Sequence, residues 1–155
     1  MVDWTYKDKY DLNDFIHIID VLRSPGGCPW DIKQTHESLK RNAVEEAYEV
    51  CEAIDEGSPE HLCEELGDLL MQVILHASMA KDEGAFDMDA IADMACKKLV
   101  HRHPHVFGAV AADTPEKVLE NWDAIKRADR AQQTAASAMD GVSHGLPGLM
   151  RSEKI

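Results

Sequence analysis

Two short acidic motifs are the residues in this sequence best suited to chemistry. The segments EEAYE, residues 45–49, and EELGD, residues 64–68, each hold two carboxylates three residues apart, Glu46 with Glu49 and Glu65 with Asp68. In an α-helix this spacing separates side chains by about 60° around the axis, on neighbouring turns of one flank. The sequence therefore predicts two helices that each present an acidic pair.

Four carboxylates cannot share a partly buried site without compensation, because like charges raise one another's pKa and oppose folding. A hard divalent cation removes the conflict. Mg²⁺ and Mn²⁺ prefer oxygen ligands, orient a water molecule and offset charge during phosphoryl chemistry. The alternative is that both motifs are solvated helix faces, which are common in acidic proteins. Glu56, just beyond the first motif, is interpreted as such a surface residue.

The second motif fits a solvated face poorly. It lies in a segment that is apolar nearly all round between residues 62 and 79, and such a helix packs between neighbours. Gly67, inside the motif, carries a helix penalty of about 1 kcal/mol, which indicates close approach by another segment.

The elements that must position these motifs are helices. Apolar positions recur at helical spacing, whereas alternating strand patterns are scarce. The predicted helices cover about residues 10–23, 35–57, 59–82, 87–102 and 114–131, with a loop over Cys28-Pro29-Trp30-Asp31 and Thr35 as a candidate N-cap. The short connection Gly57-Ser58-Pro59 makes the two acidic helices antiparallel neighbours. We expect an all-α bundle of about five helices around this central pair.

Length and pattern favour one domain followed by a tail. The chain has 155 residues, enough for a single core. The domain is expected over residues 1–131. Residues 132–155 have no helical core pattern and are interpreted as a tail or linker.

Composition excludes several classes of partner. The 29 acidic and 16 basic residues give a formal net charge of −13, which repels duplex nucleic acid and anionic membrane surfaces. No apolar run is long enough to span a bilayer, and the N-terminus lacks the layout of a signal peptide. The four cysteines form no C-x-x-C pair and are interpreted as reduced thiols. A cytoplasmic protein is expected.

Several segments, taken in order, resemble one known family. They are GCPWD at 27–31, QTH at 34–36, SL at 38–39, EEAYE at 45–49, ELGDLL at 65–70, RHPHVF at 102–107, and NW at 121–122 with Ile125-Lys126. Together they resemble the MazG nucleotide pyrophosphohydrolases over about residues 12 to 130. Each motif alone is weak, but the ordered combination is specific.

The resemblance implies an activity and a metal site. It implies a helical domain that forms a homodimer or larger assembly and splits a nucleoside triphosphate into its monophosphate and pyrophosphate, as a housecleaning enzyme of the nucleotide pool. Mg²⁺, with Mn²⁺ as a substitute, would be held by Glu46, Glu49, Glu65 and Asp68, and Glu45 is a candidate to support them from outside the ligand shell.

The resemblance also implies substrate contacts. The basic residues that match the family's phosphate contacts are Lys98, Arg102 and Lys126, and the matching aromatic residues are Trp30 and Trp122. A solvated surface is the alternative for the basic residues, and a packed core or interface is the alternative for the tryptophans.

Nearby histidines suggest a second metal. His101, His103 and His105 alternate around Pro104, which is poor geometry for a zinc site on one helix, so a packing or capping role is favoured.

Two alternatives remain for the function. MazG proteins often hold two such domains, and LPGLMR at 146–151 resembles the linker ahead of a second one. The chain would then be a non-catalytic nucleotide-binding or dimerisation half. A di-metal carboxylate bundle with iron or manganese usually adds E-x-x-H pairs. Glu65 with Asp68 lacks the histidine, and His61 follows Ser58 rather than a glutamate.

Overall fold

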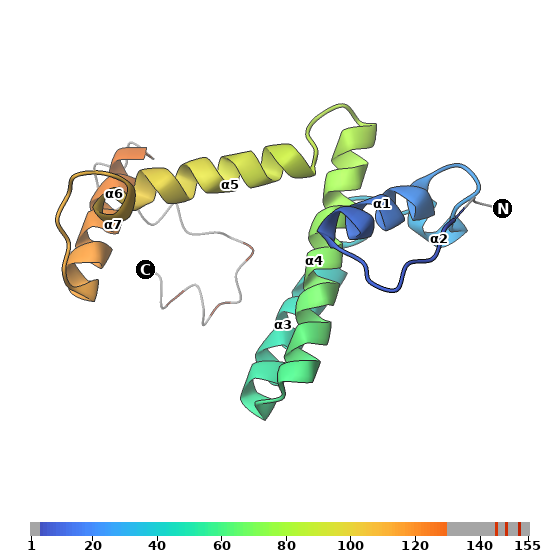
Figure 1. The fold of residues 1–155 in the computed structure, drawn as a ribbon, viewed down its shortest axis with the longest axis horizontal. Helices are drawn as coiled ribbons and strands as arrows, with labels where there is room; N and C mark the ends of the chain where they lie inside the picture. The colour runs from blue at the N-terminus through green and yellow to red at the C-terminus, as the bar shows by residue number, and fades with distance from the viewer. Residues whose placement is uncertain (1–3, 130–144, 146–147, 149–151, 153–155) are drawn as a thin grey trace. The chain divides into compact units, whose positions relative to one another are not determined.

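The computed structural model describes residues 4–129, 145, 148 and 152, and within them the protein is entirely helical (Figure 1). The helices over residues 4–129 are α1 (Leu12–Arg23), α2 (Pro29–Ile32), α3 (Lys40–Glu56), α4 (Pro59–Asp82), α5 (Met88–Arg102), α6 (Pro104–Phe107) and α7 (Pro115–Asp129). The predicted all-α class is confirmed. The chain divides into two compact units, Met1–Asp93 and Met94–Ile155, which are described in turn.

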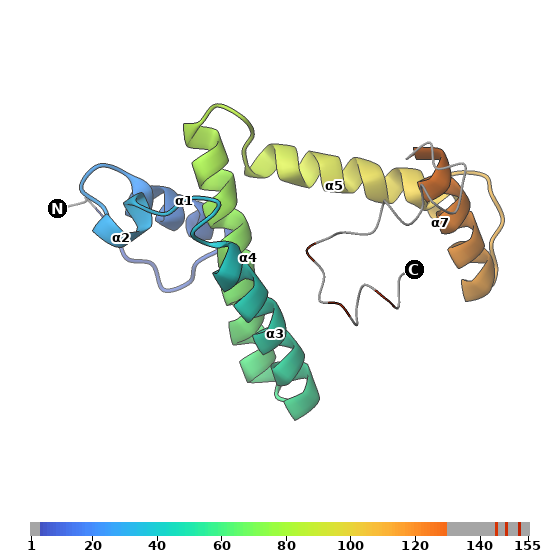
Figure 2. The same ribbon diagram turned by 180° about the vertical axis from the view of Figure 1, so that it is seen from behind.

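The first unit is built on an antiparallel hairpin of α3 and α4. The two helices lie side by side in opposite views (Figures 1 and 2). Gly57 ends α3 in the left-handed region, at φ 69°, where glycine has no Cβ penalty. Ser58 then caps α4 by accepting a hydrogen bond from the His61 amide, and Pro59 occupies the first turn. The hairpin predicted from this connection is confirmed.

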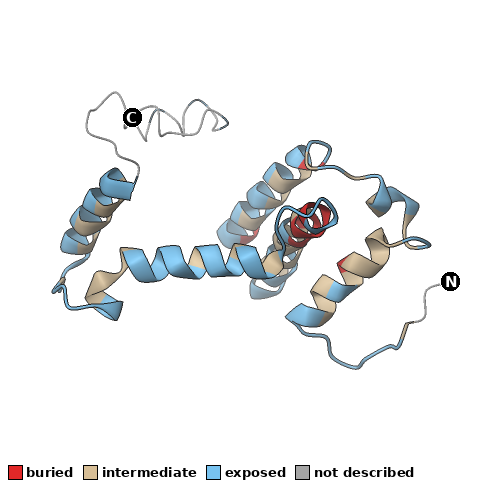
Figure 3. Cartoon of the chain, turned by 90° about the horizontal axis from the view of Figure 1, so that it is seen from above, coloured by how far each residue is buried: buried red, intermediate tan, exposed pale blue. Residues whose placement is uncertain are grey.

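The core of the first unit lies around the C-terminal half of α4. Its central side chains come from α1, α4 and the segment before α3, and they are Ile19, Leu39, Ile74, Leu75 and Met79. Figure 3 shows most of the buried positions on one stretch of α4, and they run from Gln72 to Ala80 with Val73 and His76 less covered. Burial of apolar area here is the main source of stability.

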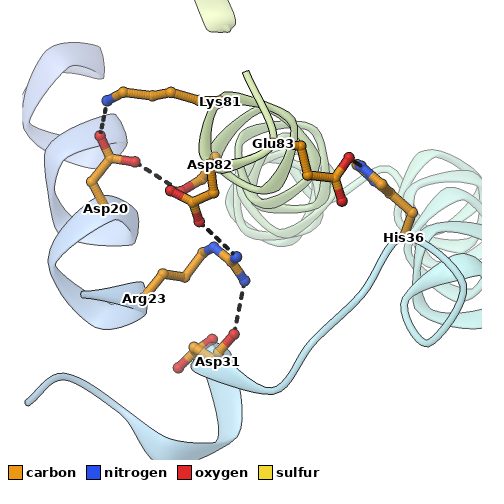
Figure 4. A network of polar contacts seen from close by, with 8 residues as sticks. Asp20, Arg23, Asp31, His36, Lys81, Asp82 and Glu83 are labelled. Atoms are coloured by element: carbon orange, nitrogen blue, oxygen red, sulfur yellow. Dashed lines mark hydrogen bonds and ion pairs between the residues drawn. The ribbon is translucent and has the colours of Figure 1, made fainter. Parts of the chain in front are cut away.

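Polar contacts around this core fix α1 and α2 against α4 (Figure 4). Asp20 accepts hydrogen bonds from Ser78 and Lys81, both at 2.7–2.8 Å. Burial alone would raise the pKa of Asp20, but these two hydrogen bonds outweigh it and the pKa is lowered. Arg23 pairs with Asp82 at 3.1 Å and donates to the Asp31 carbonyl at 2.9 Å. These contacts also position the segment that carries Trp30.

The predicted loop over residues 28–31 is wrong, because this segment forms the short helix α2. Pro29 stands in its first turn, where a missing amide proton is no loss, and the Ile32 amide donates to the Cys28 carbonyl at 3.0 Å. Helix α6 was missed for the same reason, since Pro104 also stands at its start. In both segments a helix begins at the proline.

The predicted start of the first acidic helix at Thr35 is also wrong. Thr35 and Ser38 exchange hydrogen bonds, with the Thr35 amide donating to Ser38 Oγ at 2.9 Å and the Ser38 amide donating to Thr35 Oγ1 at 3.1 Å. This reciprocal pair has the form of a capping box, and the Leu39 amide donates to the Thr35 carbonyl at 3.2 Å, so Thr35 caps a turn that precedes the helix. The helix begins at Lys40, after the buried residue Leu39.

The second unit packs α7 against the end of α5. Asp129 accepts from His101 Nε2 at 3.0 Å and lies 3.5 Å from an Arg102 nitrogen. The Trp122 ring meets the His103 ring edge-on, with centroids 5.0 Å apart. The expected helices over 87–102 and 114–131 are confirmed within the described residues, and Thr114 accepts from the Lys117 amide at the start of α7.

Two further predictions concern the chain as a whole. Among the described residues no helix combines the length and apolarity needed to cross a membrane. The predicted tail, residues 132–155, lies almost wholly outside the described residues.

Candidate metal centre

Three carboxylates from the hairpin converge. Glu46 and Glu49 on α3 and Glu65 on α4 each offer an oxygen, and these oxygens all lie within 4.8 Å of one another. Glu46 and Glu65 are half-buried, whereas Glu49 is exposed. The helical spacing of three places the first two on one flank of α3, and the antiparallel pairing brings Glu65 to them.

The pKa of Glu46 is raised by its surroundings. Burial raises the pKa of Glu46, and a hydrogen bond with Glu49 and the charges of Glu49, Asp68 and Glu65 raise it further. Ionisation of this carboxyl is therefore less favourable in the site than in water, and a bound cation would offset that cost. This is the electrostatic state expected of an anionic cluster that binds a cation.

Two other predicted residues are placed less centrally. Asp68 is half-buried and near enough for its charge to raise the pKa of Glu46, but it is not among the three mutually close carboxylates. Glu45 forms an ion pair with Arg41 on its own helix, at 2.7 Å. The ligand role of Asp68 and the supporting role of Glu45 stay predictions.

The donor set fits a hard divalent cation. All donors are carboxylate oxygens, which suits Mg²⁺ or Mn²⁺ and disfavours metals that prefer thiolate or imidazole ligands. Ligand oxygens about 2.1 Å from one Mg²⁺ lie at most about 4.2 Å apart. Separations of up to 4.8 Å thus need only small side-chain rotations to close around an ion.

A histidine beside the cluster was missed as a participant. His61 Nε2 lies 3.0 Å from Glu65 Oε1, and His61 Nδ1 lies 2.7 Å from Glu56 Oε2. The bond with Glu56 raises the pKa of His61, and the charge of Glu65 adds to this. The i, i+4 spacing of His61 and Glu65 was the available signal. The interpretation of Glu56 as a surface residue without a role also overlooked this contact.

The predicted substrate residues of the second unit lie on α5 and α7. Lys98 is exposed, Arg102 is turned to Asp129, and Lys126 lies 5.8 Å from the centre of the Trp122 ring. Trp122 is half-buried against His103, so the packing alternative for it is realised at least in part. Proximity of these residues to the carboxylates stays a prediction.

Trp30 has a different environment. It lies on α2 with 56% of its surface exposed, and its carbonyl accepts from the Gln34 side chain at 2.9 Å. Its indole is therefore free to stack on a ligand, although the role itself stays a prediction.

The histidines around Pro104 contact neighbouring residues of the second unit, and His101 pairs with Asp129. His103 hydrogen-bonds the Leu99 carbonyl through Nδ1 at 2.6 Å and its ring contacts His105. Among the described residues, the carboxylates of α3 and α4 form the group of three or more residues suited to a metal, and these histidines do not belong to it.

Comparison with known proteins finds similar sequences. Residues 34–107 match the MazG nucleotide pyrophosphohydrolase domain. The chain is 46% identical over 146 residues to "Uncharacterized protein YabN" of Bacillus subtilis and 43% identical over 145 residues to a "Nucleoside triphosphate pyrophosphohydrolase" of Escherichia coli. These alignments cover 94% and 93% of the chain, but the chain spans only 30% and 55% of the two relatives.

A solved structure is also similar. The crystal structure of a mazG-related protein from Thermotoga maritima superposes with a TM-score of 0.62 at 28% identity, covering 75% of this chain and 99% of that one. The matched segment, 34–107, includes both acidic helices. This segment, which holds both acidic motifs, is therefore similar to the MazG nucleotide pyrophosphohydrolase domain.

Proposed function

We propose that this chain is a Mg²⁺-dependent nucleoside triphosphate pyrophosphohydrolase that releases a nucleoside monophosphate and pyrophosphate. The observation that carries the proposal is the convergence of Glu46, Glu49 and Glu65, with the raised pKa of Glu46. The MazG domain and the name of the Escherichia coli relative support the choice of reaction.

The ligand set is proposed to be Glu46, Glu49, Glu65 and Asp68. The bound ion would supply Lewis-acid polarisation of phosphate oxygens and a more acidic water. The carboxylates fix its position, and those not saturated by the ion accept hydrogen bonds that orient water. Mn²⁺ is expected to substitute, because its ligand preference is similar.

The substrate is proposed to be an anionic nucleotide held by basic side chains. Lys98, Arg102 and Lys126 supply positive charge for the phosphates, and Trp30 and Trp122 supply surfaces for a base. In this proposal the enzyme removes ordinary or damaged nucleoside triphosphates from the nucleotide pool.

The protein is further proposed to act as a homodimer. Apolar side chains remain exposed on the hairpin, and Val44 and Tyr48 on α3 lie four residues apart on one face, each more than half exposed. Leu66 and Val73 on α4 are also exposed. A second copy would bury this surface, which soluble monomers rarely leave open.

A substrate screen tests the reaction. The purified chain is incubated with a panel of nucleoside triphosphates and Mg²⁺, and pyrophosphate and orthophosphate are measured separately, with and without chelator. We expect chelator-sensitive release of pyrophosphate, with orthophosphate appearing only after a pyrophosphatase is added. Direct orthophosphate release would indicate a γ-phosphatase. Nucleotide binding without any release would indicate a binding half of a longer protein.

A further inference from the structure

A chain of polar contacts leads from the α3–α4 turn to the carboxylate cluster. Glu56 is the last residue of α3, and its carboxylate lies 2.7 Å from His61 Nδ1. The opposite ring nitrogen of His61 lies 3.0 Å from Glu65 Oε1. Carboxylates accept hydrogen bonds and imidazole N–H groups donate them, so the ring can donate to both carboxylates when each of its nitrogens carries a proton.

The backbone holds His61 where this bridge is possible. His61 lies in the first turn of α4, where its amide donates to Ser58 Oγ at 3.2 Å. This capping bond anchors the start of the helix. Because Glu65 follows by four residues, its side chain lies on the same face as that of His61.

Exposure decreases along the contact chain. The side chains of Glu56, His61 and Glu65 are 51%, 35% and 12% exposed. Glu65 is thus the shielded end, and Glu56 is the solvated one. A carboxylate at that shielded end has one oxygen engaged by His61, which leaves its second oxygen for a further partner.

We infer that Glu56 and His61 are positioning residues that hold Glu65 in the orientation in which it binds the metal ion. The inference rests on the proposed function, because it takes Glu65 as a metal ligand. The His61 imidazole and the Glu56 carboxylate thus lie outside the metal ligands and support them. Neither residue touches the ion.

The physical reason is the freedom of an unrestrained glutamate. A glutamate side chain loses rotamer entropy when it is fixed, and a partner that fixes it beforehand removes part of this cost from metal binding. Groups that orient metal ligands in this way typically change metal affinity or activity by about 10–100-fold when they are removed.

The test measures Mn²⁺ binding to the full chain without nucleotide, by electron paramagnetic resonance of the free ion. The variants are His61→Ala, His61→Gln, Glu56→Gln and the double variant Glu56→Gln/His61→Ala. We expect His61→Ala to weaken Mn²⁺ binding about tenfold and Glu56→Gln to weaken it less. The double variant should match His61→Ala, because Glu56 acts only through His61.

Two further variants separate positioning from damage to the fold. His61→Gln keeps an N–H donor that reaches Glu65, so it should restore part of the affinity, which a merely structural loss at the helix start would not allow. Glu60→Gln is the matched control, because Glu60 is the exposed neighbour of His61 and makes no side-chain hydrogen bond or ion pair within the described part of the chain. It should leave Mn²⁺ binding unchanged.

Glu65→Gln distinguishes failure of this inference from failure of the proposed function. If Glu65→Gln abolishes Mn²⁺ binding but His61→Ala binds Mn²⁺ as tightly as the unaltered chain, the positioning role is overturned and the metal site stands. If Glu65→Gln leaves Mn²⁺ binding intact, the metal site is overturned and the positioning role with it. Helix content measured on every metal-free variant identifies any that fail to fold.

Discussion

The two halves of α4 differ more than any sequence pattern along it suggests. From Gln72 to Ala80, seven of the nine positions are fully buried, around Ile74, Leu75 and Met79. Between residues 60 and 71, no position is fully buried. The carboxylates of the candidate site lie on this partly exposed N-terminal stretch of α4, as Glu65 and Asp68, or on the neighbouring helix α3, as Glu46 and Glu49. One helix thus supplies the core at one end and tolerates clustered like charges at the other, where solvent still screens them.

The largest effect is expected from damage to the buried half. Leu75→Ala removes a side chain that is 2% exposed, and we expect it to lower the free energy of unfolding by about 2–5 kcal/mol. Chemical denaturation measures this loss. Turnover per folded molecule should change little, and a large loss of turnover in the folded fraction would mean that the two halves are coupled.

The next largest effect is expected in the partly exposed half of α4 and its neighbour α3, where substitutions should reduce turnover and leave stability intact. Glu46→Gln or Asp68→Asn keeps the side-chain shape and removes one charge, so the metal-free protein should be as stable as before or slightly more stable. Turnover should fall on the order of a hundredfold, because the ion and its water lose their alignment.

The raised pKa of Glu46 gives the sign of this stability change. The folded state binds a proton at Glu46 more tightly than the unfolded state does, so its ionisation at neutral pH opposes folding and the amide removes that penalty. Thermal melts with and without Mg²⁺ check both effects. Near-normal turnover together with metal-induced stabilisation would show that the site is wrongly placed. Glu60→Gln should stay within about 0.5 kcal/mol of the unaltered protein.

A smaller effect is expected at Gly67, in the same open half. A Cβ at this position meets no atom within 4 Å, so the close approach predicted from the sequence is absent within the described residues. Gly67→Ala should therefore stabilise the isolated helix by about 1 kcal/mol. If a second copy covers this face, as proposed, the same methyl group should weaken the dimer.

Light scattering over a dilution series measures the outcome at Gly67. A more stable protein with unchanged association would exclude Gly67 from the interface.

The smallest effect concerns His76, at the edge of the buried half. Burial lowers the pKa of His76 below its ordinary value of 6.5, and the neighbouring His36, 2.7 Å away between Nδ1 atoms, lowers it further. The unfolded chain then binds the proton more readily. The contribution of His76 to stability should be complete above pH 6.5 and should decline as the pH falls through this value.

Denaturation at a series of pH values, with His76→Gln as the comparison, measures this slope. His36 also lies 4.0 Å from Glu83, so the slope should respond to Glu83→Gln as well. An unchanged slope in His76→Gln would assign the pH dependence to other groups.

Much of the fold was predictable because it depends on local chemistry. Ser58, Pro59 and Gly57 fix the hairpin by capping and backbone preference, and these signals are contained in adjacent residues. The start of α3 was not predictable in the same way. Thr35 does accept a capping hydrogen bond from the Ser38 amide, but the turn that it caps is separate from the long helix, which begins at Lys40.

The candidate site was predictable to a similar extent. The spacing of Glu46, Glu49 and Glu65 was sufficient to place them together, since helix periodicity and antiparallel pairing determine their faces. The contact between Glu56 and His61 was not predictable from spacing, because it depends on the rotamers of two side chains at the end of the hairpin. Glu56 is exposed, as interpreted, but it also contacts His61.

The tight connection at Gly57 also bears on the order of folding. Glu46 and Glu65 are separated by only about 20 residues, and the chain between them reverses over Gly57 and Ser58. Contacts of such short sequence separation have a small loop-closure entropy and form quickly, whereas the packing of Ile19 against Ile74 must close a much longer loop. The repulsion among the carboxylates is therefore expected to arise early, before the core is complete. A divalent cation present during refolding should accelerate the folding rate as well as stabilise the final structure.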